Sequence, residues 1–271
     1  MSFYTSLSGL KAAQTDLGVI AHNIANAETT GFKKSDTQFA DLVAGGAASD
    51  PRMMKGIGSA VSTITQNFTL GAVEQTGNVT DLAITGDGFF ALRGGESGKT
   101  SYTRNGAFLL DQNGFLHDGS GNRLQMMAVD ASGQPVSPGT TVDTQLPLAN
   151  AAGADLAGVT IGKDGAISAA YADGGIVTLG RVALASFTSP AGLRQLGSSK
   201  WEATGLSGAA DIGSPGVGRN GTLLSGALER SNVDLAEEMV GLISAQRNFQ
   251  ANAKAIDTAT QISQTVINLR T

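Results

Sequence analysis

Two stretches decide the fold, SFYTSLSGLKAAQTDLGVIAHNIAN at residues 2–26 and LAEEMVGLISAQRNFQANAKAIDTATQISQTVINLR at residues 235–270. In both, apolar side chains recur after three and then four residues, which places them along one stripe of an α-helix. We expect two terminal helices that pair as in a coiled coil. The predicted seam consists of Phe3, Leu7, Leu10, Leu17, Ile20, Ile24, Leu235, Met239, Leu242, Phe249, Ile256, Ile262, Val266 and Leu269.

The ends of these helices carry their own signals. Turn-forming residues gather at 26–31, and Gly31 can adopt a positive φ, so the first helix should end near Asn26. The second should begin near residue 231, where Ser231 and Asp234 fit a capping box. It would run for about 38 residues, or about 57 Å at 1.5 Å per residue.

The 200 or so residues between the helices have the pattern of short antiparallel strands. Asp-Gly or Asn-Gly pairs at 105–106, 113–114, 118–119 and 164–165 favour tight turns. The fold class is therefore α+β and mainly β. We expect a discontinuous helical domain (1–30 and 232–271), connecting segments (31–75 and 202–231) and a β-rich outer domain (76–201). Residues 44–58 are expected to form an exposed loop.

Composition limits the functions that this chain can have. Charged residues make up 15% and aromatic residues 5%, with 37 glycines. This fits either a protein that buries much of its surface against copies of itself or an ordinary Gly/Ala-rich β-protein. The net charge of −5 argues against binding to nucleic acid, which favours a basic face.

Sequence signals for export and membrane insertion are missing. The 271 residues contain no cysteine, which excludes disulfides, thiolate metal sites and a cysteine nucleophile. No secretory signal opens the chain, and no apolar run of about 18 residues could span a membrane. By these signals alone the expected location is the cytoplasm.

No catalytic, cofactor-binding or metal-binding residues are predicted. Residues 216–221 match G-x-G-x-x-G, but no strong strand precedes them and no helix follows directly, so we reject a dinucleotide site. His22 and His117 lack partners for a catalytic triad or zinc. The segment beginning at Asp111 has its glycine at position 4 and Asn122 at position 12, which does not fit a calcium loop.

Several stretches together resemble the bacterial flagellar axial proteins, the family of rod and hook subunits. They are residues 8–14 and 23–33, 76–90, 102–114, 226–235 and 245–254. The family-motif residues are Asn23, Asn26, Gly31, Phe32, Ser231, Asn232, Val233, Gln246 and Arg247. Residues 61–71 and 245–254 resemble hook more than rod subunits. The length is closer to that of a distal rod subunit, because typical hook subunits carry an extra outer β-domain.

The resemblance implies a self-assembling structural subunit of the flagellar hook, the flexible tubular joint between rod and filament, with a distal rod subunit as the alternative. It also implies export through the flagellar type III apparatus without a cleaved signal, which would replace the cytoplasmic expectation. Implied partners are copies of the chain itself and the rod, hook-cap and hook–filament junction proteins, without nucleic acid or membrane insertion. A soluble scaffolding module and an enzyme with an unrecognised site are the competing interpretations.

Overall fold

A computed structural model describes residues 2–44, 55–95, 98–130, 134, 136 and 139–268, and the chain divides into two compact units. Residues 1–27, 34–67 and 233–271 form the first unit, and residues 28–33 and 68–232 form the second. The architecture confirms the α+β, mainly β class, with one helix at each end of the chain and antiparallel strands between them.

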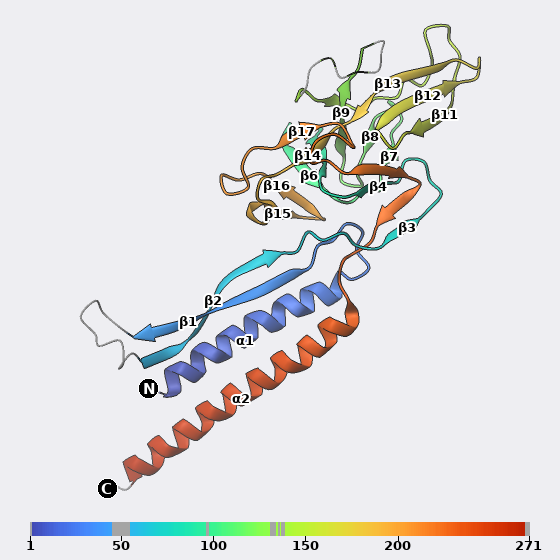
Figure 1. Cartoon of the computed structure of the whole chain (residues 1–271). Coiled ribbons are helices and arrows are strands. Elements are labelled where there is room, and N and C mark those ends of the chain that lie inside the picture. The colour runs from blue at the N-terminus through green and yellow to red at the C-terminus, as the bar shows by residue number, and fades with distance from the viewer. Residues whose placement is uncertain are drawn as a thin grey trace. The chain divides into compact units, whose positions relative to one another are not determined.

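The first unit is an antiparallel pair of helices covered on one side by a β-ribbon. In Figure 1, α1 (Ser2–Ala25) lies between α2 (Leu235–Asn268) and the ribbon of β1 (Ser35–Ala44) and β2 (Lys55–Gln66). Small side chains allow close packing of the helices: Ala12, Ala13 and Ala245 are buried. A Cβ atom added to Gly9 would lie 2.6 Å from the side-chain oxygen of Asn252, so these two residues face each other across the pair.

Since the helices are antiparallel, residues beyond about 259 in α2 have no counterpart in α1. Side chains 261–268 are all exposed. This part of α2, residues 260–268, is called the overhang below.

The second unit is built from short antiparallel strands. Its largest sheet has the order β11-β12-β13-β9-β5-β6-β16-β15, with β10, β14, β17, β7 and β8 paired at its sides. The two remaining pairs are β18 with β4 and β19 with β3. The bounds are β3 (Val73–Gln75), β4 (Leu82–Thr85), β5 (Phe89–Gly94), β6 (Thr100–Thr103), β7 (Leu109–Leu110), β8 (Leu116–His117), β9 (Asn122–Ala128), β10 (Val142–Asp143), β11 (Leu156–Ile161), β12 (Ala166–Tyr171), β13 (Ile176–Val182), β14 (Leu184–Ser186), β15 (Arg194–Gly197), β16 (Lys200–Glu202), β17 (Asp211–Gly213), β18 (Thr222–Ser225) and β19 (Ala227–Glu229).

Two apolar clusters stabilise the second unit. The larger consists of aliphatic side chains and two phenylalanines from β4, β5, β8, β9, β12, β13 and neighbouring strands. The smaller surrounds Trp201, which is fully buried and makes edge-to-face ring contacts with Phe68 and Phe89. Aromatic pairs in this geometry contribute about 0.5–1.5 kcal/mol beyond the burial of their surface.

Several local predictions are wrong in detail. The turn at 118–121 takes its positive φ at Gly121, not Gly119, and the pair at 105–106 forms no hairpin. Ala44 and residues 55–58 belong to β1 and β2 instead of a loop, while residues 45–54 lie outside the described part of the chain. The N-cap of α2 is Asp234 and not Ser231, because the Asp234 carboxylate accepts the N–H groups of Ala236 and Glu237 at 2.8 and 3.2 Å.

Gly106 sits where the chain approaches β4 most closely. A Cβ atom there would lie 1.7 Å from the carbonyl oxygen of Leu82, in a region without free space. We expect Gly106→Ala to lower the free energy of unfolding of the second unit by about 1–3 kcal/mol, since backbone atoms must move. Urea unfolding followed by Trp201 fluorescence measures this. Gly119→Ala, which meets nothing within 4 Å, is the matched control, and an equal loss in both variants would contradict the packing argument.

Candidate assembly surface and the polar clusters beside it

The predicted seam divides into a half-buried part and an exposed part. Half-buried members are Leu7, Leu10, Leu17, Ile20, Ile24, Leu242 and Ile256. Exposed members are Phe3, Leu235, Met239, Phe249, Ile262 and Val266, and Leu269 lies outside the described residues. Three further apolar side chains of α2 that the sequence reading did not place on the seam are also exposed, namely Val240, Ile243 and Ile267.

The helix pair alone therefore buries little of its apolar surface. Within the described part of α2, only Glu238 and Ala245 are buried. Met239 is 58%, Val240 65% and Val266 59% exposed. Most of the stability of helices in proteins comes from packing of an apolar face, and much of this face has no cover within the described chain.

Asn23, a family-motif residue, joins α1 to β1 and α2. Its side chain is buried; the amide oxygen accepts the backbone N–H of Ser35 and the amide nitrogen donates to the Ser35 carbonyl, each at 2.9 Å. The same nitrogen lies 3.2 Å from Oε2 of Glu238. One side chain thus holds an edge of the ribbon and the first turn of α2 against α1.

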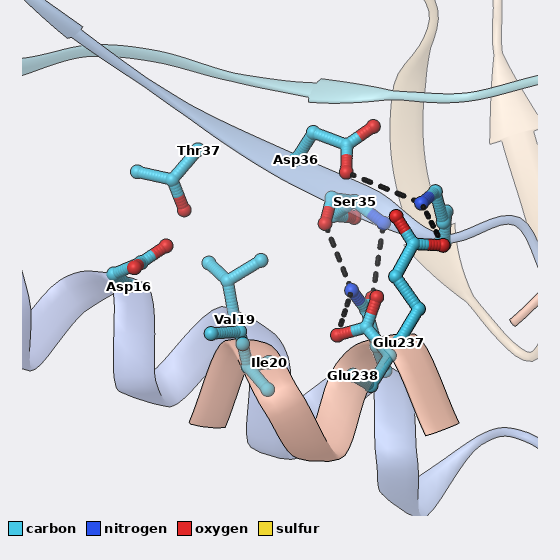
Figure 2. Close-up of a pocket in the computed structure, with 11 residues that line it drawn as sticks. Asp16, Val19, Ile20, Ser35, Asp36, Thr37, Glu237 and Glu238 are labelled. Atoms are coloured by element: carbon cyan, nitrogen blue, oxygen red, sulfur yellow. Dashed lines mark hydrogen bonds and ion pairs between the residues drawn. The ribbon is translucent and has the colours of Figure 1, made fainter. Parts of the chain in front are cut away.

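Acidic groups surround this junction. Figure 2 shows Glu237 and Glu238 of α2 facing Ser35 and Asp36 of β1, in a hollow also lined by Asp16. Lys34 forms ion pairs with Asp36 at 3.8 Å and with Glu237 at 3.5 Å. Burial raises the pKa of Glu238, and the charges of Asp36 and Glu237 raise it further, whereas Asn23 and Lys34 oppose this.

Two other motif residues of the N-terminal stretch, Gly31 and Phe32, lie in the segment 28–33 of the second unit. Gly31 has a φ of +67°, and a Cβ atom there would come within 2.5 Å of the backbone nitrogen of Asn105, so glycine is required. Its N–H donates to the Glu229 carbonyl at 2.8 Å. Phe32 is buried, and Asn26, in the first unit, donates its side-chain amide to the His22 carbonyl.

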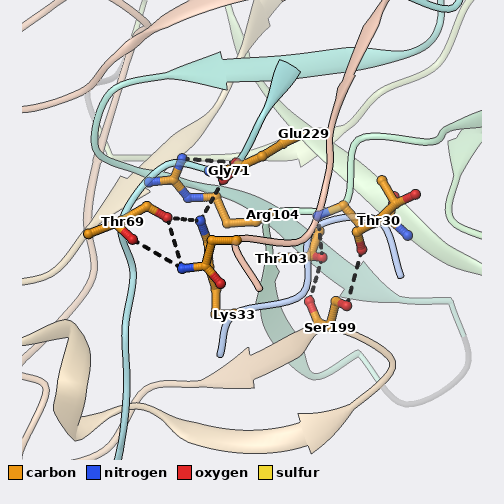
Figure 3. A network of polar contacts seen from close by, with 10 residues as sticks. Thr30, Lys33, Thr69, Gly71, Thr103, Arg104, Ser199 and Glu229 are labelled. Carbon is orange, nitrogen blue, oxygen red and sulfur yellow. Dashed lines mark hydrogen bonds and ion pairs between the residues drawn. The ribbon is translucent and has the colours of Figure 1, made fainter. Parts of the chain in front are cut away.

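A buried charge cluster lies next to this segment. Nζ of Lys33 is 2.5 Å from Oε1 of Glu229, both side chains are fully buried, and Nη1 of Arg104 lies 3.4 Å from Oε2. Figure 3 shows Lys33, Arg104 and Glu229 pointing toward one another, with Thr69 and Gly71 beside them. Burial lowers the pKa of Lys33 and of Arg104, and the negative charge of Glu229 opposes this in both.

The remaining motif residues occupy different environments. Ser231 is buried and Val233 half-buried, while Asn232 donates its side-chain amide to the carbonyl and hydroxyl oxygens of Thr69. Gln246 and Arg247 are exposed on α2, and Gln246 lines a hollow with Gln14, Leu17, Phe249 and Gln250.

The sequence reading missed the charged residues that organise both clusters, Lys33, Arg104, Glu229 and Glu238. Lys33, Arg104 and Glu229 lie inside the stretches that carry the family resemblance, and Lys33 and Arg104 are next to an aromatic or turn residue, Phe32 and Asn105. For these two, a charged side chain beside such a residue was the available signal, because the chain has few charges.

The described residues contain no group of three or more His, Asp or Glu side chains arranged to hold a metal ion. None of the helices, over the part of each that the structure describes, is apolar and long enough to cross a membrane.

Comparison with known proteins shows which family this chain is similar to. Residues 3–33 match the family described as flagella basal body rod protein, residues 83–169 the flagellar hook protein FlgE/F/G D1 domain, and residues 224–269 the flagellar basal body rod FlgEFG protein C-terminal family. The flagellar basal-body rod protein FlgG of Bacillus subtilis is 38% identical over 280 residues, covering 99% of this chain and 98% of that protein. This chain belongs to the flagellar rod and hook protein family. It is thus related to structural components of the flagellar basal body and hook.

Hook proteins match over the whole chain as well. The flagellar hook protein FlgE of Escherichia coli is 29% identical over 412 residues, covering 100% of both chains, and the FlgG protein of Borreliella burgdorferi is 32% identical over 281 residues. Because this chain has 271 residues, at least 412 − 271 = 141 positions of the hook alignment have no residue here. Relative to that hook protein, this family member is compact and lacks an inserted region.

We expect the buried Glu238 to make the stability of the first unit depend on pH. The pKa of the Glu238 carboxyl group is raised in the folded unit. The stabilisation that comes from protonated Glu238 is therefore fully present below the pKa that Glu238 has in the unfolded chain. It is lost as pH rises through the pKa that Glu238 has in the folded unit. We expect the helical content of the monomer, measured by far-UV circular dichroism, to rise as pH falls through this range. Glu238→Gln should remove much of the change and raise helicity at neutral pH.

Asp257→Asn, which removes an exposed carboxylate farther along α2, is the control. Equal pH dependence in wild type and Glu238→Gln would show that Glu238 does not govern the junction.

Proposed function

We propose that this chain is a structural, non-catalytic subunit that assembles helically with copies of itself into the flagellar hook. The observation that carries self-assembly is the exposed apolar surface of the helix pair, from Leu235 to Ile267 in α2. Full burial of a Leu, Ile or Phe side chain contributes roughly 1.5–3 kcal/mol. Several such side chains per subunit, covered by neighbouring copies, supply a large driving force for polymerisation.

In this proposal the terminal helical regions, residues 1–30 and 232–271, form the inner wall of a tube. Residues 31–75 and 202–231 connect them to the outer β-domain, residues 76–201. Copies leave the cell through the flagellar type III apparatus without a cleaved signal and contact the rod, hook-cap and hook–filament junction proteins. The predicted seam supplies the contacts between neighbouring helices.

Residues 61–71 and 245–254 support hook over rod, because they resemble hook subunits more than rod subunits. A hook protein also matches over the whole length of both chains, at 29% identity over 412 residues.

A distal rod subunit is the second candidate, and a specific observation favours it. The Bacillus subtilis rod protein aligns over 280 positions with a chain of 271 residues, so it needs almost no insertion, while the hook protein needs a large one.

Immunogold electron microscopy of isolated hook–basal bodies separates the two candidates. The strain would carry a small internal tag in this protein, placed at the exposed turn around Gly174. We expect label along the curved segment outside the outer membrane. Label confined to the straight shaft between the membranes would identify a rod subunit. Absence of label from both the curved segment and the shaft would contradict the flagellar proposal for this chain.

The exposed seam predicts the effect of a charge on assembly. Phe249→Asp places a carboxylate where a neighbouring copy should cover an apolar ring, and we expect it to abolish polymerisation while Trp201 fluorescence keeps its folded signature. Thr258→Asp, nine residues later and on the opposite side of α2, adds the same charge and is the control. Tubes of normal length from Phe249→Asp in electron micrographs would count against the seam.

A further inference from the structure

The chain passes between its two units at four places, and residues beside three of them meet in one polar cluster. These three passages follow residue 33, precede residue 68 and follow residue 232, and the fourth lies between residues 27 and 28. Nζ of Lys33, beside the first, donates to the carbonyl oxygen of Thr69, beside the second, at 2.6 Å. The side chain of Asn232, beside the third, donates to the same carbonyl at 3.2 Å. One backbone oxygen therefore joins the three passages.

Glu229 connects this point to the body of the second unit. Its Oε1 accepts from Lys33 and from the N–H of Gly71, and its Oε2 lies near Nη1 of Arg104. The Arg104 guanidinium in turn lies 5.3 Å from the ring of Phe89, in the aromatic cluster of Trp201. A continuous path of polar and ring contacts thus runs from the passages to the core of the unit.

Segment 28–33 is held along its length. Glu28 forms an ion pair with Arg230, the Thr30 carbonyl accepts the hydroxyl of Ser199, and the Gly31 N–H donates to the Glu229 carbonyl. Ser199 lies in the two-residue turn between β15 and β16, where Ser198 and Ser199 have φ values of 52° and 53°. Non-glycine residues rarely adopt this conformation, and such strain persists only where surrounding contacts impose it.

Stability alone does not explain the buried charges. The desolvation cost of a buried ion pair is about as large as, or larger than, the energy gained from the attraction between its two charges. Apolar residues of similar size often stabilise a protein better. What Lys33 and Glu229 provide is a directional connection, since both hold defined backbone groups of separate segments.

We propose that Lys33, Glu229 and Asn232 form a latch that fixes three of the four chain passages to the β-unit and carries mechanical load into it. Load here means the torque transmitted by the assembled tube, so this role rests on the proposed function. The latch acts by positioning: it keeps the three passages from separating from the β-unit when the helices are pulled or twisted.

Lys33→Met tests the latch without leaving an isolated charge, because Glu229 keeps Arg104 and Gly71 as partners. In hydrogen exchange of the full-length monomer, we expect at least tenfold faster exchange at the amides of Gly31, Gly71 and Arg230. Amides of β5 and β9 should keep wild-type rates. Arg181→Met, which removes an ion pair between Arg181 on β13 and Asp164 that involves none of the latch residues, is the control.

Asn232→Ala provides a second variant if Lys33→Met does not fold, as judged by Trp201 fluorescence. It removes the connection of the third passage and should accelerate exchange at Gly71 and Arg230. Unchanged exchange rates at these amides in a folded Lys33→Met protein would overturn the latch. If only Asn232→Ala folds, unchanged rates in that variant would overturn it.

The mechanical role is tested in a strain lacking this gene. Cells complemented with Lys33→Met should assemble filaments yet lose most of their swimming speed in viscous medium, while Arg181→Met cells swim as wild type does. Normal swimming of Lys33→Met cells at high viscosity would overturn load transfer. Failure of the wild-type gene itself to restore filaments would instead refute the proposed function and, with it, the mechanical role. The result of the hydrogen-exchange experiment would not be affected.

Discussion

The fully buried carboxylate of Glu229 is the constraint around which the second unit is organised. It faces two cations, Lys33 and Arg104, and a backbone N–H from Gly71. A buried charge is tolerated only with such partners, since desolvation costs several kcal/mol per ion. Segments 28–33, 69–72 and 228–232 must therefore converge on one point, although they are distant in the sequence. The β-unit is closed at this point by polar contacts instead of apolar ones.

The first unit follows the opposite principle. Its helices meet through small residues such as Ala12 and Ala245, and Asn23 adds a directional contact to β1. Larger apolar side chains of α2, among them Met239 and Val240, are exposed. The unit is thereby specified locally by hydrogen bonds and small contacts, while most of its apolar surface is available to neighbours.

Heptad spacing was sufficient to predict both helices, because a helical period leaves a direct mark on the sequence. Turn residues likewise predicted an antiparallel β-rich middle. The start of α2 was placed wrongly at Ser231, since two candidate caps lie three residues apart and only the observed hydrogen bonds separate Ser231 from Asp234. The Lys33–Glu229 pair joins residues 196 positions apart, and no local pattern records such a contact.

The overhang of α2 makes the two ends of the helix pair inequivalent. Residues 260–268 continue for about 13 Å beyond the first residue of α1, at 1.5 Å per residue. In the proposed assembly, the overhang would pack on a different part of another copy. Contacts of that heterologous kind repeat from one copy to the next and generate rings or open helices. A difference in length between two helices of one chain would then give the polymer a direction.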